Sequence, residues 1–195
     1  MFSQLRTFIK RKTSQQYKFD LQYARNQWDS MASLADLGRY SIIVGLVKYF
    51  CPGGRVLDLG CGEGILQEKF SPADYTHFTG VDFSRVAIDR ASAKALPNTT
   101  YLVGDLNALD VPGVFDVIIY NESIYYMDDP EAAIKRLLPQ LAPGGIIIIS
   151  QVDKHGKEQT AMWDLLNPTL DLAARNKVTN AQGYSWTIHV YKPRQ

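Results

Sequence analysis

Beyond residue 53, short apolar runs of strand length alternate with segments in which apolar residues recur at helical spacing. One run, Phe115–Tyr120, is continuous and apolar, as expected for a strand that is buried on both faces. This alternation is typical of βαβ units arranged around a mostly parallel sheet. The five runs are Arg55–Leu59, Thr76–Val81, Thr100–Gly104, Phe115–Tyr120 and Ile146–Ser150.

Helices are predicted between and after these strands, near Gly64–Phe70, after Ser84, over Pro130–Leu141 and near Lys157–Ala174. Ser84 has the side chain of a helix cap. Asp129 is a second candidate cap, because the proline that follows it suits the first position of a helix. The predicted elements therefore alternate between strand and helix up to about residue 174, except between the third and fourth strands.

The last predicted element is a strand over Ser185–Tyr191, in which side chains alternate between two faces with a period of two. We expect this strand to pair antiparallel with Val178–Thr179 or with the fifth strand, with Asn180–Gly183 as the turn. The pattern thus favours a sheet that is parallel at its centre and antiparallel at its C-terminal end.

The residues before Gly54 have a different character and are predicted to form an N-terminal helical lid on the sheet. Aromatic side chains precede an apolar helix over Tyr40–Phe50. We divide the chain into this extension, residues 1–53, and an α/β unit, residues 54–195, within one domain. Residues 2–9 place apolar side chains on one helical face with cations around them, which suits a membrane surface or, as we favour, a solvated basic face.

Composition narrows the possible functions. The chain has 195 residues, of which 46% are hydrophobic, and its net charge is +1, so we expect no nucleic-acid partner. No apolar run reaches the roughly 20 residues of a transmembrane helix, and no signal-peptide pattern is present, so a cytoplasmic location is expected. Cys51 and Cys61 form neither a CxxC pattern nor a Cys/His cluster, which excludes a disulfide scaffold and a zinc site.

Three glycines follow the first predicted strand, at Gly60, Gly62 and Gly64. Glycines at this place let the backbone turn sharply and approach a ligand closely. Dinucleotide folds use the spacing GxGxxG, whereas position 65 of this chain is Ile. Asp58 lies just before the glycines and would repel a pyrophosphate. The turn therefore favours a ligand that carries positive charge, such as an amino group or a sulfonium.

Two acidic residues end the next two strands. Asp82 follows the second strand, where a carboxylate can accept hydrogen bonds from the ribose hydroxyls of an adenosine. Asp105 follows the third strand, where a carboxylate can accept a hydrogen bond from an adenine amino group. A helix cap at Asp82 and a turn at Asp105 are the alternatives to these functional interpretations.

Several segments together resemble class I S-adenosylmethionine-dependent methyltransferases. Asp58–Gly64 resembles their motif I, and Asp82 and Gly104-Asp105 match the acidic positions after the second and third strands. Phe115–Ile118 and Leu137–Gly145 resemble the segments before the fourth and fifth strands. The resemblance covers Gly54–Ser150, in order and at the spacing of the family.

The resemblance implies a doubly wound, Rossmann-like sheet of seven strands whose last strand is antiparallel, and S-adenosylmethionine as cofactor. It implies that Gly60 and Gly62 contact the cofactor backbone, Asp82 the ribose and Asp105 the adenine. Tyr120 and Asn121, at the end of the fourth strand, would face the methionine part and the acceptor. The predicted cofactor-binding residues are Asp58, Gly60, Cys61, Gly62, Asp82, Phe83, Asp105, Leu106 and Asn121.

Methyl transfer from a sulfonium is an in-line displacement, so the enzyme mainly aligns the acceptor and excludes water. A base is needed only where the nucleophile arrives protonated. Glu122 is the candidate for holding or deprotonating the acceptor, with a surface carboxylate as its alternative interpretation. His155 is the histidine candidate for a general base, with an exposed loop residue as the alternative. No metal site is predicted.

The segment after the fourth strand lacks the Asn/Asp-Pro-Pro-Tyr/Phe pattern of DNA amino-methyltransferases, so a flipped base is not the expected substrate. We expect a small-molecule acceptor that is methylated on nitrogen or oxygen. Tyr125, Tyr126, Tyr17 and Trp28 are predicted to line its pocket, although ordinary packing also explains such aromatic residues. A catalytically silent cofactor-binding module and a nucleotide-binding oxidoreductase are the alternative functions.

Overall fold

The computed structural model describes residues 15–153 and 156–194, apart from the side chains of residues 156–159. The basic N-terminal segment and His155 therefore lie outside the described residues. No helix within the described ranges combines the length and apolar character that a transmembrane span needs.

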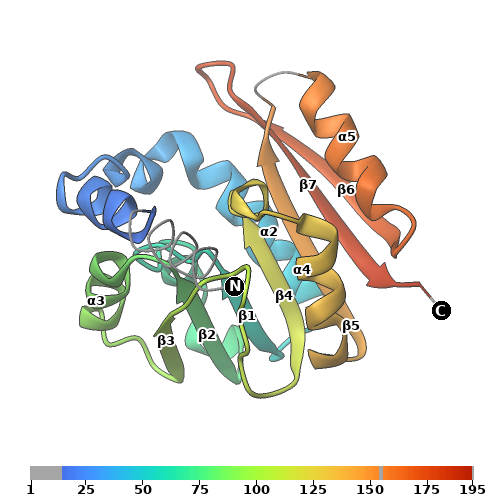
Figure 1. The fold of residues 1–195 in the computed structure, drawn as a ribbon, viewed down its shortest axis with the longest axis horizontal. Helices are drawn as coiled ribbons and strands as arrows, with labels where there is room; N and C mark the ends of the chain where they lie inside the picture. Colours follow the sequence, from blue (N-terminus) through green and yellow to red (C-terminus); the bar gives the residue numbers. More distant parts are fainter. Residues whose placement is uncertain (1–14, 154–155, 195) are drawn as a thin grey trace, which may run out of the picture.

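A single sheet of seven strands forms the centre of the fold, in the order β3-β2-β1-β4-β5-β7-β6. Strands β1 to β5 pair in parallel, whereas β7 pairs antiparallel with both β5 and β6 (Figure 1). This arrangement confirms the predicted fold class, and β7 satisfies both of the pairings left open above. The strands are β1 (Arg55–Leu59), β2 (His77–Asp82), β3 (Thr99–Val103), β4 (Phe115–Asn121), β5 (Leu141–Val152), β6 (Leu170–Thr179) and β7 (Ser185–Pro193).

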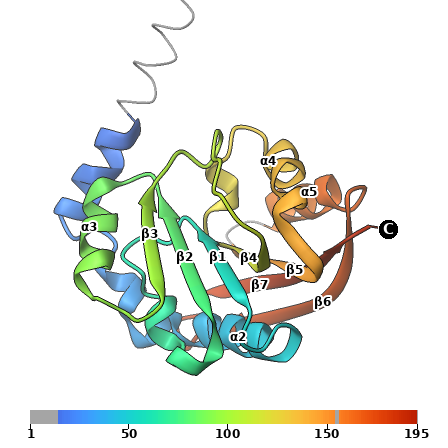
Figure 2. The same ribbon diagram turned by 90° about the horizontal axis from the view of Figure 1, so that it is seen from below.

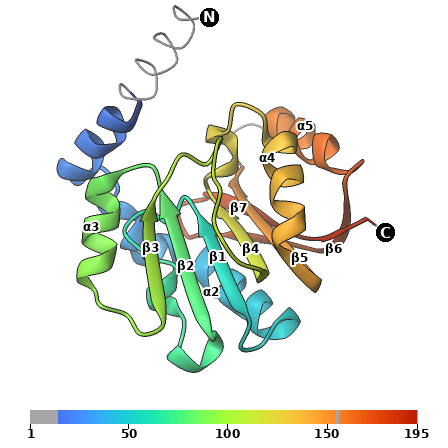
Figure 3. The same cartoon turned by 60° about the horizontal axis from the view of Figure 1, so that its bottom comes forward.

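Helices cover both faces of the sheet. Viewed from below, the sheet separates α2 from α4 and α5 (Figure 2). Residues 15–24 are helical and lie at the carboxyl edge of the sheet, above α3, which runs beside β3 (Figure 3). The helices are α2 (Leu34–Phe50), α3 (Arg85–Ala93), α4 (Pro130–Leu137) and α5 (Gly156–Leu166), and the 3-10 helices are η1 (Asp29–Ala32), η2 (Gln67–Lys69), η3 (Pro72–Asp74), η4 (Ile124–Tyr126) and η5 (Leu138–Gln140).

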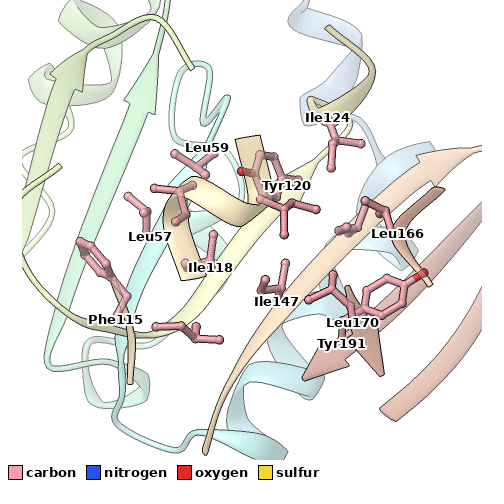
Figure 4. Close-up of a cluster of buried hydrophobic side chains, with 14 of the residues drawn as sticks. Leu57, Leu59, Phe115, Ile118, Tyr120, Ile124, Ile147, Leu166, Leu170 and Tyr191 are labelled. Carbon is pink, nitrogen blue, oxygen red and sulfur yellow. The ribbon is translucent and has the colours of Figure 1, made fainter. Parts of the chain in front are cut away.

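Each face of the sheet carries its own apolar core, because alternate side chains of a strand point to opposite faces. On one face, Ile118 and Ile147 pack against Leu166 of α5, together with side chains of α4 (Figure 4). On the other face, Val117 and Ile148 belong to a cluster with side chains of α2. The central strands are therefore buried on both sides, as the continuous apolar sequence of β4 predicts for that strand.

The predicted helix near Gly64–Phe70 is wrong, since only the 3-10 helix η2 forms there. Gly60, Gly62 and Gly64 all adopt positive φ angles, so the left-handed backbone extends to residue 64. Only six residues then remain before Ser71, which caps η3 in a capping box with Asp74. This length is too short for a stable α-helix after the turn.

The predicted helix over Lys157–Ala174 is wrong in its second half. Helix α5 ends at Leu166, and the chain returns as β6, which pairs with β7 along its length. Alanines and an arginine after Leu172 favour a helix by propensity. Pairing with β7 overrides that propensity, because it satisfies the backbone hydrogen bonds of the strand on one side.

Smaller differences concern α4 and β5. Helix α4 begins with the predicted Asp129 cap, which accepts a hydrogen bond from the Ala132 N–H at 3.0 Å, but it passes into η5 at Leu138. Pro139 lacks the N–H that would continue the α-helix. Strand β5 begins at Leu141, before the predicted start at Ile146, and its pairing with β4 shifts register between these two residues.

Candidate active site

A cavity opens at the carboxyl edge of the parallel strands, where ligands bind in sheets of this kind. It encloses about 1000 Å³ of space including its mouth. The loops after β1, β2, β3 and β4 form one wall, and the N-terminal helices and α2 form the other. Eight of the predicted cofactor residues line it, as do Tyr126 and Trp28, and those eight are Gly60, Cys61, Gly62, Asp82, Phe83, Asp105, Leu106 and Asn121.

The glycine turn brings bare backbone to the cavity. Gly60 and Gly62 have φ angles of 81° and 55°, which side chains rarely tolerate. A Cβ atom on Gly60 would lie 2.4 Å from the Cβ atom of Ser123, and one on Gly62 would lie 2.8 Å from the Tyr23 hydroxyl oxygen. A side chain at either position would require its neighbour to move, so both positions favour glycine, whereas the close approach of this backbone to a ligand stays a prediction.

Asp82 is buried at the base of this wall. Its carboxylate accepts hydrogen bonds from the backbone N–H groups of Gly62 at 2.9 Å and of Ser84 at 2.8 Å. Burial raises its pKa to about 6, although these N–H groups favour the ionised form. Ser84, rather than Asp82, caps α3, since its side chain accepts a hydrogen bond from the Ala87 N–H. The helix-cap interpretation of Asp82 is therefore wrong.

Asp105 and Asp58 occupy different environments. Asp105 lines the cavity and also accepts a hydrogen bond from the Asn107 N–H at 2.9 Å, which closes a turn. Asp58 is almost fully buried and is not among the residues that line the cavity. Burial raises its pKa to about 7, against the lowering effect of Arg39. Its Oδ1 atom makes no hydrogen bond within the described residues, so its predicted contact with the cofactor stays a prediction.

Arg39 is a buried cation in the cavity wall that sequence reasoning missed. Its side chain, from α2, is 1% exposed and donates hydrogen bonds to Asn121, to Asp36 at 2.8 Å and to the Tyr40 hydroxyl at 3.2 Å. Its Nε atom has no partner among the described residues. Buried charges are normally fully paired. A lone arginine in an apolar helical stretch, three residues after Asp36, was the available signal.

Glu122 is a buried carboxylate that also lines the cavity. It is 8% exposed and has a positive φ of 59°, so the interpretation as a surface carboxylate is wrong. Its carboxylate accepts hydrogen bonds from the Ser150 hydroxyl at 3.2 Å, the Val152 N–H at 3.1 Å and the Tyr125 hydroxyl at 3.3 Å. Burial raises the pKa of Glu122, while Arg39 and the three donors oppose this shift.

Comparison with known proteins identifies the family. Residues 23–186 match the profile of a methyltransferase domain. The chain belongs to this methyltransferase domain family. Membership of this family excludes the alternative function of a nucleotide-binding oxidoreductase. The family uses S-adenosylmethionine as its cofactor, as the sequence predicted.

Individual relatives agree with this assignment. A ubiquinone biosynthesis O-methyltransferase of Aeromonas salmonicida is 29% identical over 56% of this chain and 48% of its own length. A 2-methyl-6-phytyl-1,4-hydroquinone methyltransferase of Synechocystis is 28% identical over 87% of this chain and 51% of its own length. The chain thus spans about half the length of these curated relatives.

A solved structure resembles the methyltransferase domain over most of its length. The N-methyltransferase NodS of Bradyrhizobium japonicum WM9, in complex with S-adenosylhomocysteine, superposes with a TM-score of 0.73 at 19% identity. The match covers 86% of this chain and 92% of that chain. At this level of identity the likeness shows the shared fold.

The predicted acceptor residues of the methyltransferase domain divide into two groups. Trp28 and Tyr126 line the cavity, and Phe19 packs edge-to-face on Tyr126 with ring centroids 5.6 Å apart. Tyr17 and Tyr125 do not line it and are 67% and 41% exposed. Asn121 lines the cavity and accepts its hydrogen bond from Arg39. His155 stays a prediction outside the described residues.

Side-chain hydrogen bonds attach the N-terminal region to the opposite wall of the cavity and to α3. Asp20 accepts a hydrogen bond from the Ser84 hydroxyl at 2.6 Å, and Asn26 accepts one from Arg90 of α3 at 3.1 Å. Within the described residues, no group of His, Cys, Asp or Glu has an arrangement that could hold a metal ion.

Proposed function

We propose that this protein is an S-adenosylmethionine-dependent methyltransferase that transfers a methyl group to oxygen or nitrogen of a small-molecule acceptor. The observation that carries the proposal is the meeting of three features at one cavity. They are the exposed backbone of the glycine turn, the buried Asp82 carboxylate and the buried Arg39 guanidinium.

These features match the parts of the cofactor. In the proposed arrangement the backbone at Gly60 and Gly62 faces the methionine part, and Asp82 accepts hydrogen bonds from the ribose hydroxyls. The unpartnered Nε atom of Arg39 offers a donor to the carboxylate of the cofactor. Asp105, with the neighbouring Phe83 and Leu106, would then hold the adenine. Asp58 adds negative charge beneath the turn, which favours a cationic ligand.

For methyl transfer, the protein mainly has to align the acceptor with the methyl group. When bound, S-adenosylmethionine supplies a methyl group that is already activated as a sulfonium. The chain orients the acceptor along the line of displacement and excludes water. The aromatic side chains of Tyr23, Trp28 and Tyr126 suit these tasks, since aromatic faces also stabilise positive charge. Glu122 lies on the acceptor side of the cavity and holds or deprotonates the acceptor.

The relatives support a small acceptor. Their names describe O-methylation in ubiquinone biosynthesis, methylation of a hydroquinone and N-methylation by NodS. The cavity is open at its mouth and lined by the aromatic side chains of Phe19, Tyr23 and Trp28, which suits a compact acceptor beside the cofactor.

Calorimetry and an acceptor panel test this function. We expect the purified protein to bind S-adenosylmethionine and S-adenosylhomocysteine but not NAD, and to methylate at least one member of a panel of phenols, carboxylic acids and amines. Arg39→Gln should weaken cofactor binding, while Lys135→Gln, which removes an exposed cation paired with Glu131, should not. Cofactor binding without methyl transfer to any acceptor would point to a silent binding module.

A further inference from the structure

The environment of Glu122 distinguishes its two carboxylate oxygens. Oε2 accepts hydrogen bonds from the Val152 N–H and the Tyr125 hydroxyl, whereas Oε1 accepts one, from the Ser150 hydroxyl. A carboxylate offers about four acceptor positions. One position, on Oε1, is therefore left for a further donor, and the carboxylate lines the cavity.

The backbone holds this arrangement in place. Glu122 adopts a left-handed conformation, and its N–H donates to the Ser150 carbonyl oxygen at 3.1 Å. Tyr125 lies one turn later, in η4, where its hydroxyl reaches Oε2 while its ring stays 41% exposed. Strained backbone of this kind persists at sites where the surrounding structure fixes a side chain for a task.

We infer that the methyl acceptor is a hydroxyl compound whose proton is taken by Oε1 of Glu122, and that Tyr125 is the positioning residue for this base. The inference rests on the proposed function and names the class of its substrate. Tyr125 does not line the cavity, so it acts through Glu122 rather than by contact with the acceptor.

A hydroxyl fits this site better than an amine does. A neutral amine is already nucleophilic and needs no base, whereas a hydroxyl must lose its proton to become a strong nucleophile. Arg39 donates a hydrogen bond to Asn121, the residue before Glu122, so a positive charge already lies near the carboxylate. An ammonium group would meet this charge, whereas a hydroxyl arrives neutral and develops negative charge that Arg39 stabilises.

The reaction balances without another reactant. The acceptor O–H bond breaks and its proton passes to Oε1 of Glu122. The acceptor oxygen bonds to the methyl carbon as the carbon–sulfur bond breaks, and that electron pair remains on sulfur. The proton then leaves Glu122 for water when the product departs. During the step, Tyr125 keeps its own proton and its hydrogen bond to Oε2.

The groups that face Glu122 determine its pKa and therefore the pH dependence of the proposed methyl transfer. Arg39 comes from α2, Tyr125 and Tyr126 from η4, and Ser150 and Val152 from β5. Because Tyr125 donates to the ionised carboxylate, its removal should raise the pKa of Glu122 further. A variant that loses only packing at this exposed ring would leave that pKa unchanged.

Tyr125→Phe tests the inference in the full chain through the pH–rate profile with a catechol as acceptor. We expect the rising limb to move to higher pH by roughly one unit, with turnover about tenfold lower below the limb and nearly unchanged above it. Tyr184→Phe is the matched control, because it removes a hydroxyl from another exposed tyrosine, in the β6–β7 turn. A limb that stays in place overturns the role of Tyr125.

A titration that needs no turnover completes the test. The chain has five glutamates, so carboxyl signals of ¹³C-labelled glutamate are resolvable, and Glu122→Gln assigns the signal of Glu122. We expect Tyr125→Phe to raise the pKa of that signal. Transfer to amines but not to catechols or other phenols would overturn this inference and leave the proposed function intact. Cofactor binding without any transfer would overturn both.

Discussion

The two halves of the sheet are both buried, yet they differ in what they bury. The half made of β1, β2 and β3 ends in left-handed glycines and in the carboxylates of Asp58 and Asp82, whose pKa values burial raises to about 7 and about 6. The half made of β5, β7 and β6 is packed against α5 by apolar side chains, including Leu166, with a single buried histidine, His189, among the described residues.

This difference indicates that one half of the sheet mainly serves ligand binding and the other mainly stabilises the fold. Ionised carboxylates and positive φ angles lower the stability of the empty protein, so their presence at one edge of the sheet points to a ligand that uses them. Apolar burial in the other half stabilises the fold without contacting the cavity. Substitutions in the two halves should therefore change different measurements.

The largest effect is expected in the apolar half. Leu166→Ala removes a side chain that is 0% exposed, and it should lower the free energy of unfolding by about 3 kcal/mol through lost burial and a cavity. Urea unfolding measures this loss, and calorimetry should find the S-adenosylmethionine affinity unchanged. An affinity that falls in parallel with stability would break the proposed separation.

Gly60→Ala should affect both measurements. The φ of 81° and the 2.4 Å approach to Ser123 predict a loss of about 2–3 kcal/mol in stability, together with a displaced turn and weakened cofactor binding. Gly45→Ala is the control, because Gly45 is an exposed helical residue of α2 with open space at its Cβ position. That change should stabilise the protein by up to about 1 kcal/mol.

Asp82→Asn should act mainly on binding. The amide keeps one oxygen for a backbone N–H group and loses the charge, so we expect cofactor affinity to fall about 10- to 100-fold by calorimetry, with a smaller loss of stability. Asp82→Ala is the less informative change, since it would leave the N–H groups of Gly62 and Ser84 without their acceptor. Unchanged affinity in Asp82→Asn would place the ribose elsewhere.

The smallest effects are opposite pH dependences. Burial lowers the pKa of His189 to about 4, so its contribution to stability is present above about pH 6.5 and is lost as pH falls through 4. Asp58 and Asp82 have raised pKa values, so their contribution is present below about pH 4 and is lost as pH rises through 6 to 7.

Urea unfolding between pH 4 and pH 7 separates these contributions. His189→Phe should make the protein gain more stability on acidification, because the loss at acid pH is removed. Asp58→Asn should do the reverse, because the gain is removed. If the free energy of unfolding changes equally with pH in the wild type and in both variants, the burial of His189 and Asp58 does not shift their pKa values as expected.

The local sequence was enough to predict the residues at the strand ends that line the cavity. Gly60, Gly62 and Asp82 lie within three residues of strand ends, and the parallel sheet brings those ends to one edge whatever the rest of the chain does. The same logic identified the caps at Ser84 and Asp129, since a cap acts on its own helix. Where propensity conflicted with long-range pairing, as in β6, the prediction was wrong.

The sequence by itself thus predicted the parallel strands and the glycines and carboxylates at their ends, because these depend on short spacings along the chain, and its ordered motifs indicated the family and the seven-stranded fold. Only the tertiary structure placed Arg39 beside Asn121, which is 82 residues away, and gave Glu122 its partners on β5. Those contacts depend on how α2 packs on β4 and on how β4 pairs with β5. The burial that raises the pKa of Glu122 comes from the same packing, which no local spacing encodes.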